Sequence, residues 1–489
     1  MTRGRLCLLV LVAAPALAQE SPDLQARRLL EDGRAYRSQG KLKQALDNFN
    51  IIVSSFSGTS AIGQALLEIG RYRMDVEGDA EKARASFEQV AKQYPQSDGA
   101  PGAYYYLGLL TLNRAAAAAD LDDALAQFTR VQNLYPKSEW VPKALQASGL
   151  VHRKAGRFAE AVDVNRRVSL EYPSSEAAPA AQFQIGHALA VMGEPRQAME
   201  EFQQVRNRYA ESDWSARALE RITALYRLYG TGKPSFALDP AFGAGAGDVL
   251  RDVRAILMAP GGLLWIASDK SKSAVPIDQS GKVGPGLAGE DLRALALTPR
   301  GEVIVAAKTA IRFGPKDLRS FAVPSDKPGV PESLERILSA TVTPGGAILV
   351  ADEKRRRVYR YDAAYEFKGT FPERDVKERQ VTRMLVDGEG GIVFLDREDK
   401  SVQVYSESGK VLRTLGPAGF RKPVDVAVDP FRNTYVADEE AGVLVFNPQG
   451  QLLTTLAGPE LKRPKALTLD ATGAVLVYDD RAEKVFRYR

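Results

Sequence analysis

Side chains that commonly carry out catalysis are scarce in this chain of 489 residues. It has two histidines, His152 and His187, and a single cysteine, Cys7. Residues 235–489 contain no histidine or cysteine, so they cannot supply a histidine-rich metal cluster, a thiol nucleophile or a serine, histidine and aspartate triad. The inventory therefore predicts a protein that is not an enzyme and that holds neither a metal nor a cofactor. We interpret His187 as structural, although it is also a candidate for a binding groove.

Aspartate recurs in the second half of the chain, each time at the end of an apolar run. These residues are Asp269, Asp352, Asp396, Asp438 and Asp479. Such carboxylates could surround a Ca²⁺ ion in a central channel. Their recurrence once per repeat favours turn-forming hydrogen bonds instead, and this is our interpretation.

These aspartates belong to a pattern of four short apolar runs that occurs six times. The turn after the first run falls at Pro260, Pro299, Pro344, Asp387, Asp429 and Asp470, in steps of 39 to 45 residues. Apolar alternation broken by Asp, Pro, Asn and Gly indicates antiparallel strands. Four strands per repeat at this period predict a six-bladed β-propeller over residues 235–489.

The last repeat ends on its third strand, at residues 485–489, so the ring needs an outer strand from elsewhere. We expect residues 235–238 to supply it, with residues 249–253 as the alternative. The Pro-rich insertion at residues 314–331 is expected to be a long surface loop.

The blades resemble NHL-repeat propellers. The segments that carry this resemblance are KPVDVAVDPFRNTYVAD, RPKALTLDATGAVLVYD and VQVYSESGKVL.

A helical repeat occupies the first half of the chain. Its units end at Phe56, Tyr94, Tyr135, Tyr172 and Tyr209, in steps of 37 to 41 residues, and a proline and a serine follow most of these positions. Proline ends one helix and the serine can cap the next. Small and aromatic residues four apart on the second helices, such as Ala83 and Phe87, indicate close helix crossings. The pattern predicts an α-solenoid of five hairpins with a capping helix over residues 19–230.

This half resembles the tetratricopeptide repeat, in the form with Tyr-Pro-x-Ser junctions found in periplasmic proteins. It is similar to the tetratricopeptide proteins of the Tol-Pal system and of outer-membrane β-barrel assembly. The resemblance implies a multidomain α and β protein that binds other proteins. The linker at residues 231–234 is so short that we expect the two modules to be in contact.

The first residues have the composition of a secretory signal peptide. Arg3 and Arg5 precede an apolar run at residues 6–14, and Ala16, Leu17 and Ala18 follow. We expect cleavage after Ala18, which removes Cys7 and leaves a periplasmic protein without disulfides. A membrane anchor is the weaker alternative, because the run is too short to span a bilayer.

Charge is nearly balanced, with a formal net charge of +5. This balance argues against a nucleic-acid partner. Candidate partner-binding residues of the helical groove are Arg27, Arg34, Arg37, Tyr72, Tyr105, Phe183 and His187. Loops on one propeller face contribute Lys354, Arg355, Arg356, Arg357, Arg421, Lys422, Lys462 and Arg463. Both sets could instead be ordinary solubilising residues.

The sequence thus favours a periplasmic, non-enzymatic adaptor within a cell-envelope machine, such as one for outer-membrane assembly, envelope constriction, secretion or gliding motility. Its partners would be envelope proteins, with peptidoglycan or another anionic glycan as further candidates. The alternative is a glycan-binding propeller or an enzyme that its helical arm recruits. That alternative predicts a deep pocket at the channel mouth, lined by carboxylates with shifted pKa values.

Overall fold

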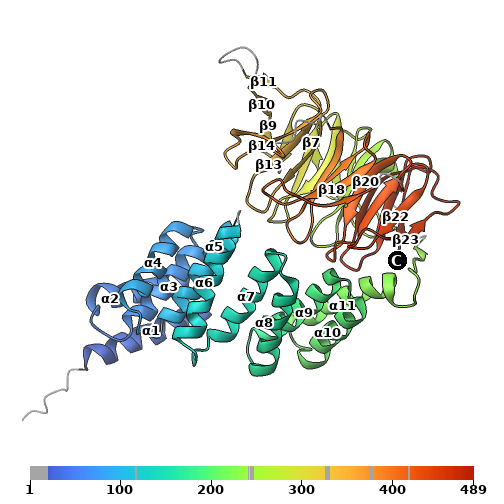
Figure 1. The fold of residues 1–489 in the computed structure, drawn as a ribbon. Coiled ribbons are helices and arrows are strands. Elements are labelled where there is room, and N and C mark those ends of the chain that lie inside the picture. The colour runs from blue at the N-terminus through green and yellow to red at the C-terminus, as the bar shows by residue number, and fades with distance from the viewer. Residues whose placement is uncertain are drawn as a thin grey trace, which may run out of the picture. The chain divides into compact units, whose positions relative to one another are not determined.

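Eleven helices are followed by strands throughout the second half of the chain in the computed structural model (Figure 1). The structure describes residues 20–489 except 116–117, 240–241, 243–246, 325–330, 374–378 and 417–418. The expected signal peptide, residues 1–18, lies outside the described residues. No helix within the described part has the length and apolarity needed to cross a bilayer.

The chain forms two compact units. Unit 1 comprises residues up to 110 together with 133–140, and unit 2 comprises residues 111–132 and 141–489. The helices are α1 Pro22–Ser38, α2 Leu42–Ser55, α3 Ile62–Asp75, α4 Ala80–Gln93, α5 Ala100–Arg114, α6 Ala118–Leu134, α7 Val141–Lys154, α8 Phe158–Glu171, α9 Ala178–Met192, α10 Pro195–Arg208 and α11 Asp213–Tyr229. Helices α7 to α11 and all the strands belong to unit 2.

The contact between a glycine on the first helix and an aromatic ring on the second sets the distance between the two helices of a hairpin. A Cβ atom on Gly33 of α1 would lie 2.5 Å from the ring of Phe49 on the following helix. A Cβ atom on Gly70 of α3 would lie 2.4 Å from the ring of Phe87. The aromatic residue therefore fills the space inside its own hairpin. In the fourth hairpin Asn165 takes the place of the ring.

The serines at the hairpin junctions act differently from the caps that the sequence suggested. Ser97 Oγ donates a hydrogen bond of 2.7 Å to the carbonyl of Tyr94, and Ser212 Oγ does the same to Tyr209. Within the described part of the chain, neither hydroxyl accepts a hydrogen bond from a backbone N–H group of the helix that follows. The serine thus closes the turn after the preceding helix, because its hydroxyl reaches the carbonyl three residues back.

Six four-stranded antiparallel sheets form the propeller. They are β2 Val253–Met258, β3 Leu264–Ser268, β4 Ser273–Ile277 and β5 Leu287–Ala288; β6 Leu292–Leu297, β7 Val303–Ala307, β8 Ile311–Phe313 and β9 Leu318–Arg319; β12 Ile337–Val342, β13 Ile348–Asp352, β14 Arg357–Tyr361 and β15 Phe367–Thr370; β16 Val381–Val386, β17 Ile392–Asp396, β18 Ser401–Tyr405 and β19 Val411–Leu415; β20 Pro423–Val428, β21 Thr434–Asp438, β22 Gly442–Phe446 and β23 Leu452–Leu456; β24 Pro464–Leu469, β25 Val475–Asp479 and β26 Lys484–Tyr488, with β1 Leu238–Asp239. The innermost strands β2, β6, β12, β16, β20 and β24 contact one another in succession, so the ring is closed.

Ring closure uses the segment that we expected. Leu238 of β1 pairs with Tyr488 of β26, and Asp239 pairs with Arg487. The backbones of Ala237 and Arg489 also exchange two hydrogen bonds, of 2.7 and 2.9 Å. The alternative segment forms a short 3₁₀ helix, Gly247–Leu250, before β2. The outer edge of β26 is therefore paired.

The insertion at residues 314–331 is more ordered than the surface loop that we expected. It contributes β9 to its blade, and a two-stranded ribbon follows, with β10 Ala322–Val323 paired to β11 Glu332–Ser333. Phe321 and Val323 are buried in the core of the neighbouring blades, and Tyr361 Oη donates to the carbonyl of Ala322. Residues 325–330 are outside the described part.

Candidate functional site

The strongest cluster of charged groups lies where α7 and α9 meet the turn between β16 and β17. Glu389 in this turn has a side chain that is 1% exposed. Its Oε1 atom is 3.0 Å from Nη1 of Arg153 on α7 and 2.6 Å from Nε2 of His187 on α9. We call these three residues the joint.

The joint carries one ion pair and one hydrogen bond from a neutral imidazole to a carboxylate. Burial opposes ionisation of Glu389, but the hydrogen bond from His187 and the charge of Arg153 outweigh it and lower the pKa of Glu389. Burial lowers the pKa of His187, although its bond to Glu389 acts in the opposite direction. We therefore describe His187 as a neutral imidazole that donates from Nε2 to an ionised Glu389, whose charge Arg153 balances.

Helix α11 makes a second set of contacts with the propeller. Arg227 Nη1 donates to the carbonyl of Thr472 over 2.6 Å, and Tyr229 Oη donates to Oδ1 of Asn433 over 2.6 Å. Asn433 in turn donates to Oδ2 of the buried Asp429. Burial raises the pKa of Asp429 to about 6, against the hydrogen bonds from Asn433 and Phe431. A chain of hydrogen bonds thus runs from α11 into the turn between β20 and β21.

Apolar packing completes this interface within unit 2. Phe431 is 1% exposed and belongs to the same cluster as Phe202 of α10 and Leu225 of α11. Its ring centroid is 5.8 Å from that of His187. Gly473, with φ of 73°, approaches Ala224 of α11 so closely that a Cβ would be 2.8 Å from the Ala224 Cβ. Helices α7 to α11 and the propeller therefore form one packed body.

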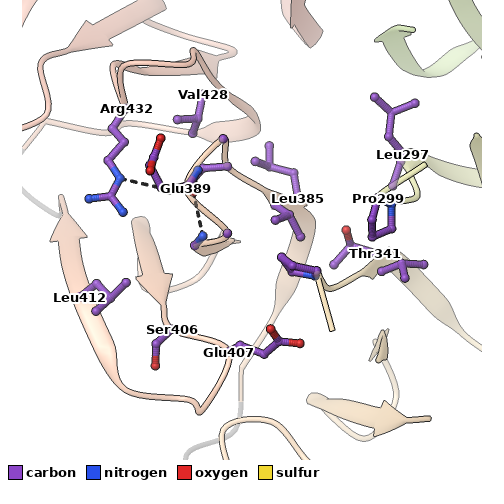
Figure 2. Close-up of a pocket in the computed structure, with 18 of the residues that line it drawn as sticks. Leu297, Pro299, Thr341, Leu385, Glu389, Ser406, Glu407, Leu412, Val428 and Arg432 are labelled. Carbon is purple, nitrogen blue, oxygen red and sulfur yellow. Dashed lines mark hydrogen bonds and ion pairs between the residues drawn. The ribbon is translucent and has the colours of Figure 1, made fainter. Parts of the chain in front are cut away.

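A cavity of about 1120 Å³ lies at the mouth of the propeller channel, on the side where α7 and α8 pack. Its wall contains apolar residues from the last positions of all six innermost strands, among them Leu297, Leu385 and Val428. In Figure 2, Leu297 and Pro299 lie on one side of the cavity and Arg432 lies on the other, with Glu389 between them. Arg153, Lys154 and Phe158 contribute from the helices.

Arg383 contributes a charged side chain to the lining of this cavity. Its side chain is buried, its Nε lies 3.2 Å from Oδ1 of Asp425, and its Nη1 donates to the carbonyl of Leu295. These partners lie on three different blades, β16, β20 and β6. Burial raises the pKa of Asp425, while Arg383 acts against that shift. The ion pair joins two neighbouring innermost strands, β16 and β20.

Three carboxylates line the cavity, and each has a partner in the structure. Glu389 belongs to the joint. Asp387 Oδ1 accepts from the backbone of Glu389 and Gly391, and its Oδ2 lies 3.7 Å from Arg432 Nε. Glu407 accepts from Thr343 Oγ1 and the Gly345 N–H. Burial is the main cause that raises the pKa of Asp387.

The predicted groove residues are divided between the two units. In unit 1, Arg34 and Arg37 of α1 form ion pairs with the buried Glu68 of α3, the former over 3.8 Å. Arg71 also pairs with Glu68, over 3.4 Å. Tyr72 is half-buried on α3, and Arg27 pairs with Asp23 at the start of α1.

An aromatic cluster in unit 1 contains the predicted Tyr105. Its ring lies 5.3 Å from both Tyr106 and Trp140, measured between centroids. Arg71 lies over the ring of Tyr106, at 5.6 Å, and so connects this cluster to Glu68. Glu68 and Arg71 thus connect Arg34 and Arg37 to this aromatic cluster.

Phe183 and His187 lie in the interior of unit 2. Phe183 packs against Phe202 and Trp214, with ring centroids 5.0 and 4.9 Å away. His187 is part of the joint. Sequence reasoning named His187 but missed its partners Glu389 and Arg153, because Glu389 is 202 residues distant. The run Asp-Gly-Glu-Gly-Gly at residues 387–391 is the local signal that could have indicated an unusual turn.

The predicted cations on the propeller lie at the opposite ends of the strands from the joint, and several are paired. Arg355 bonds to Asp352 and Glu332, Arg356 to Glu398, Lys422 to Glu439, and Arg463 to Asp480. Lys354, Arg357, Arg421 and Lys462 have no ion-pair partner within 4.0 Å in the part of the chain that is described.

Four of the repeated aspartates, Asp352, Asp396, Asp438 and Asp479, accept hydrogen bonds from the turn that follows them, whereas Asp269 accepts from Arg254 and from the N–H of Leu292. Asp438 Oδ1 accepts from the N–H groups of Glu440 and Ala441, and its Oδ2 accepts from those of Arg421 and Lys422. It thereby connects the loop before β20 to the turn after β21. Asp479 repeats the arrangement with Arg463, Arg481 and Ala482. Among the described residues there is no group of three or more potential ligands that could hold a metal ion.

Comparison with known families agrees with this geometry. The tetratricopeptide repeat matches residues 64–97, on α3 and α4, and residues 180–212, on α9 and α10. The helical region is built of tetratricopeptide repeats. Hairpins α3–α4 and α9–α10 are thus repeats of this kind, and the second of them carries His187 of the joint. No curated protein matches the chain.

Solved propellers are similar to the second half of the chain in fold. A streptogramin B lyase shares 12% identity with a TM-score of 0.39, covering 52% of this chain and 97% of its own. A virginiamycin B lyase from Staphylococcus aureus shares 16% with a TM-score of 0.40, covering 52% and 85%. A gluconolactonase from Xanthomonas campestris shares 14% with a TM-score of 0.39, covering 52% and 94%. Identities this low concern the fold alone. Tetratricopeptide repeats joined to a β-propeller point to a protein-interaction scaffold.

Proposed function

We propose that this protein is a non-enzymatic adaptor, exported to the periplasm, which binds protein partners through its tetratricopeptide repeats and its propeller. The observation that supports this proposal best is the joint, with the packing around Phe431. These contacts hold two folds that usually serve as binding scaffolds in one body. An adaptor of this kind offers each of its two folds to a separate partner.

Two surfaces are the proposed binding sites. On the propeller, Lys354, Arg357, Arg421 and Lys462 give a positive surface at the strand ends opposite the joint, which suits an acidic partner. In unit 1, Arg34 and Arg37 beside Tyr72 and Tyr105 suit a peptide with an acidic end. Arginine and aromatic residues are also the types enriched at binding hot spots.

The proposed setting is a cell-envelope machine. The basic and apolar leader with Ala16, Leu17 and Ala18 supports export. The Tyr-Pro-x-Ser junctions support a relationship to periplasmic tetratricopeptide proteins that serve envelope assembly. The nearly balanced charge supports protein partners over nucleic acid.

In-cell crosslinking and affinity capture of the full chain test this proposal. We would compare the unchanged protein with an Arg34→Glu and Arg37→Glu variant, an Arg357→Glu and Lys462→Glu variant, and Lys43→Glu as a control on an exposed position of α2. The expected result is that each double variant loses its own set of partners, while the control keeps all of them. Identical capture by every variant, or a mature chain that does not begin at Gln19 in the periplasm, contradicts the proposal.

A second candidate function has one specific observation in its favour. The cavity at the channel mouth is lined by carboxylates whose pKa values are shifted in opposite directions, with Asp387 raised and Glu389 lowered. This supports a glycan-binding propeller or an enzyme recruited by its repeats. The partners of Glu389, Asp387 and Glu407 weigh against free acid and base groups. Hydrolysis of glycosides or lactones that Asp387→Asn abolishes would favour this candidate over the adaptor.

A further inference from the structure

We propose that the channel-mouth cavity binds a small anionic amphiphile, with its aliphatic body against the inner strand ends and its carboxylate or phosphate head at Lys154 and Lys410. This inference goes beyond the adaptor function and does not depend on it. It rests on the composition of the cavity wall and on the unequal numbers of positive and negative charges there.

The wall of the cavity is mainly aliphatic. Each of the six innermost strands contributes apolar residues at its end: Leu257, Leu297, Val342, Leu385, Val428 and Leu469. All but Val342 are only partly buried by the protein itself. A ring of partly exposed apolar side chains inside a concave site is the usual lining of a small-ligand pocket. The volume of about 1120 Å³ is near the upper end of the range for such pockets, roughly 300 to 1,000 Å³.

Charge in the cavity is in positive excess. Five cationic side chains line it, Arg153, Lys154, Arg383, Lys410 and Arg432, against the three acids Asp387, Glu389 and Glu407. Arg153 and Arg432 pair with Glu389 and Asp387, and Arg383 pairs with Asp425, which lies outside the lining, so the excess is one positive charge.

The two lysines remain without a carboxylate partner. Neither Lys154 nor Lys410 has an ion pair within 4.0 Å in the described parts of the chain. Desolvation, followed by repulsion from Arg153, lowers the pKa of Lys154, although Glu407 and Glu389 act in the opposite direction. An anionic group beside Lys154 and Lys410 would supply the charge that the protein leaves unbalanced.

The shape and chemistry of the wall favour an aliphatic ligand over a glycan. Phe158 is the one aromatic side chain in the described lining, so stacking surfaces for sugar rings are scarce. Arg383 of the lining is held by its ion pair with Asp425, and we place the ligand at the mouth of the channel, where the apolar strand ends lie. The body would lie among Leu257, Leu297 and Leu385, with the head at the rim formed by α7 and the turn between β18 and β19.

Displacement of the fluorescent probe 1-anilinonaphthalene-8-sulfonate from the full-length protein tests this inference. Laurate and dodecyl phosphate, below their micelle concentrations, present the carboxylate and phosphate heads separately. Dodecyltrimethylammonium is the cationic control, and an anionic oligosaccharide represents the glycan. We expect at least one anionic amphiphile to displace the probe at concentrations about tenfold or more below those of both controls.

Matched variants locate the binding. The double variant Lys154→Ala with Lys410→Ala should weaken binding of the anionic amphiphile at least tenfold, whereas Lys154→Arg should preserve binding. Leu297→Ser should also weaken it, while Leu318→Ser, on the exposed β9, should not. Circular dichroism verifies that each variant is folded. The inference is overturned if the probe does not bind saturably, if the cationic amphiphile or the oligosaccharide competes equally well, or if the folded double lysine variant binds as the unchanged protein does.

Discussion

At the scale of single residues, the joint shows both what a sequence inventory can find and what it misses. Two histidines could be examined one by one, and His187 was interpreted as structural. The side chain of His187 is buried, which agrees with that interpretation, but its partner Glu389 belongs to the propeller and not to the helical repeats. No periodicity connects α9 to a turn in the fourth blade. A contact between two different repeats therefore has to be read from the structure.

We predict that Glu389→Gln destabilises unit 2. The change removes the negative charge beside Arg153, whose side chain is 17% exposed, and leaves a largely buried guanidinium without its ionic partner. The free energy of unfolding should fall by about 1 to 3 kcal/mol, measured by chemical denaturation at pH 7. Because the folded pKa of Glu389 is lowered, this stabilisation is present above its unfolded pKa and is lost as the pH falls through the folded value.

The control for this prediction is Glu398→Gln, which removes a solvent-exposed partner of Arg356. Its unfolding curve should match that of the unchanged protein, because exposed ion pairs contribute little. Equal effects of the two substitutions would show that the joint is no more than a surface contact.

Asp429 gives a pH dependence of the opposite sign. Burial raises its folded pKa to about 6, above an unfolded value of about 3.9. The folded state therefore takes up a proton before the unfolded state does, and stability rises as the pH falls through 6. Relative to Asp429→Asn, the unchanged protein should gain about 1 kcal/mol between pH 8 and pH 5, measured by urea denaturation. A constant difference across this range would contradict the shift.

At the scale of elements, periodicity was sufficient to place most of the structure. The six turns between first and second strands, from Pro260 to Asp470, all fall where the apolar pattern predicted. The helical repeats were equally clear, because small and aromatic residues such as Ala83 and Phe87 recur four apart on the second helices. The ribbon of β10 and β11 was missed, because two-residue strands within a Pro-rich insertion leave no periodic signal. The role of the junction serines was also misjudged, since a hydroxyl can bond backward or forward.

Close packing on the second helices leads to a prediction about α6. Ala124 is fully buried, so Ala124→Leu should overpack the crossing and lower the free energy of unfolding by about 1 to 3 kcal/mol. Ala119→Leu, on an exposed position of the same helix, is the control and should leave the thermal midpoint unchanged. An unchanged midpoint for Ala124→Leu would mean that the assigned helix register is wrong.

The strand that closes the ring can be tested at a single backbone donor. Ala237→Pro removes the N–H that donates to the carbonyl of Arg489 over 2.7 Å. We expect a loss of roughly 1 to 3 kcal/mol in unfolding free energy and new association through the exposed edge of β26. Ala237→Val keeps the donor and should remain monodisperse. Light scattering together with denaturation separates the two effects, and a monodisperse, fully stable proline variant would refute the role of this strand.

At the scale of the whole molecule, the packing around Phe431 implies that α9 to α11 and the propeller lose structure together. Phe431→Ala should cost about 3 to 5 kcal/mol and accelerate amide hydrogen exchange in α9 to α11 as well as in the turn between β20 and β21. Phe371→Ala, in a blade core that contains no helix residue, should destabilise the propeller without this local acceleration. Equal exchange in α9 to α11 for the two variants would argue against a shared core.

The joint also has a consequence for competition. Arg153 and His187 lie on the first helices of their hairpins, the helices that in other repeats accept a separate chain, and here a turn of the same polypeptide occupies them. A tethered occupant acts at an effective concentration on the order of millimolar, so an outside peptide of ordinary micromolar affinity would not evict it. We therefore predict that outside peptides do not bind where Glu389 covers α7 and α9, and that the preceding hairpins remain available to them.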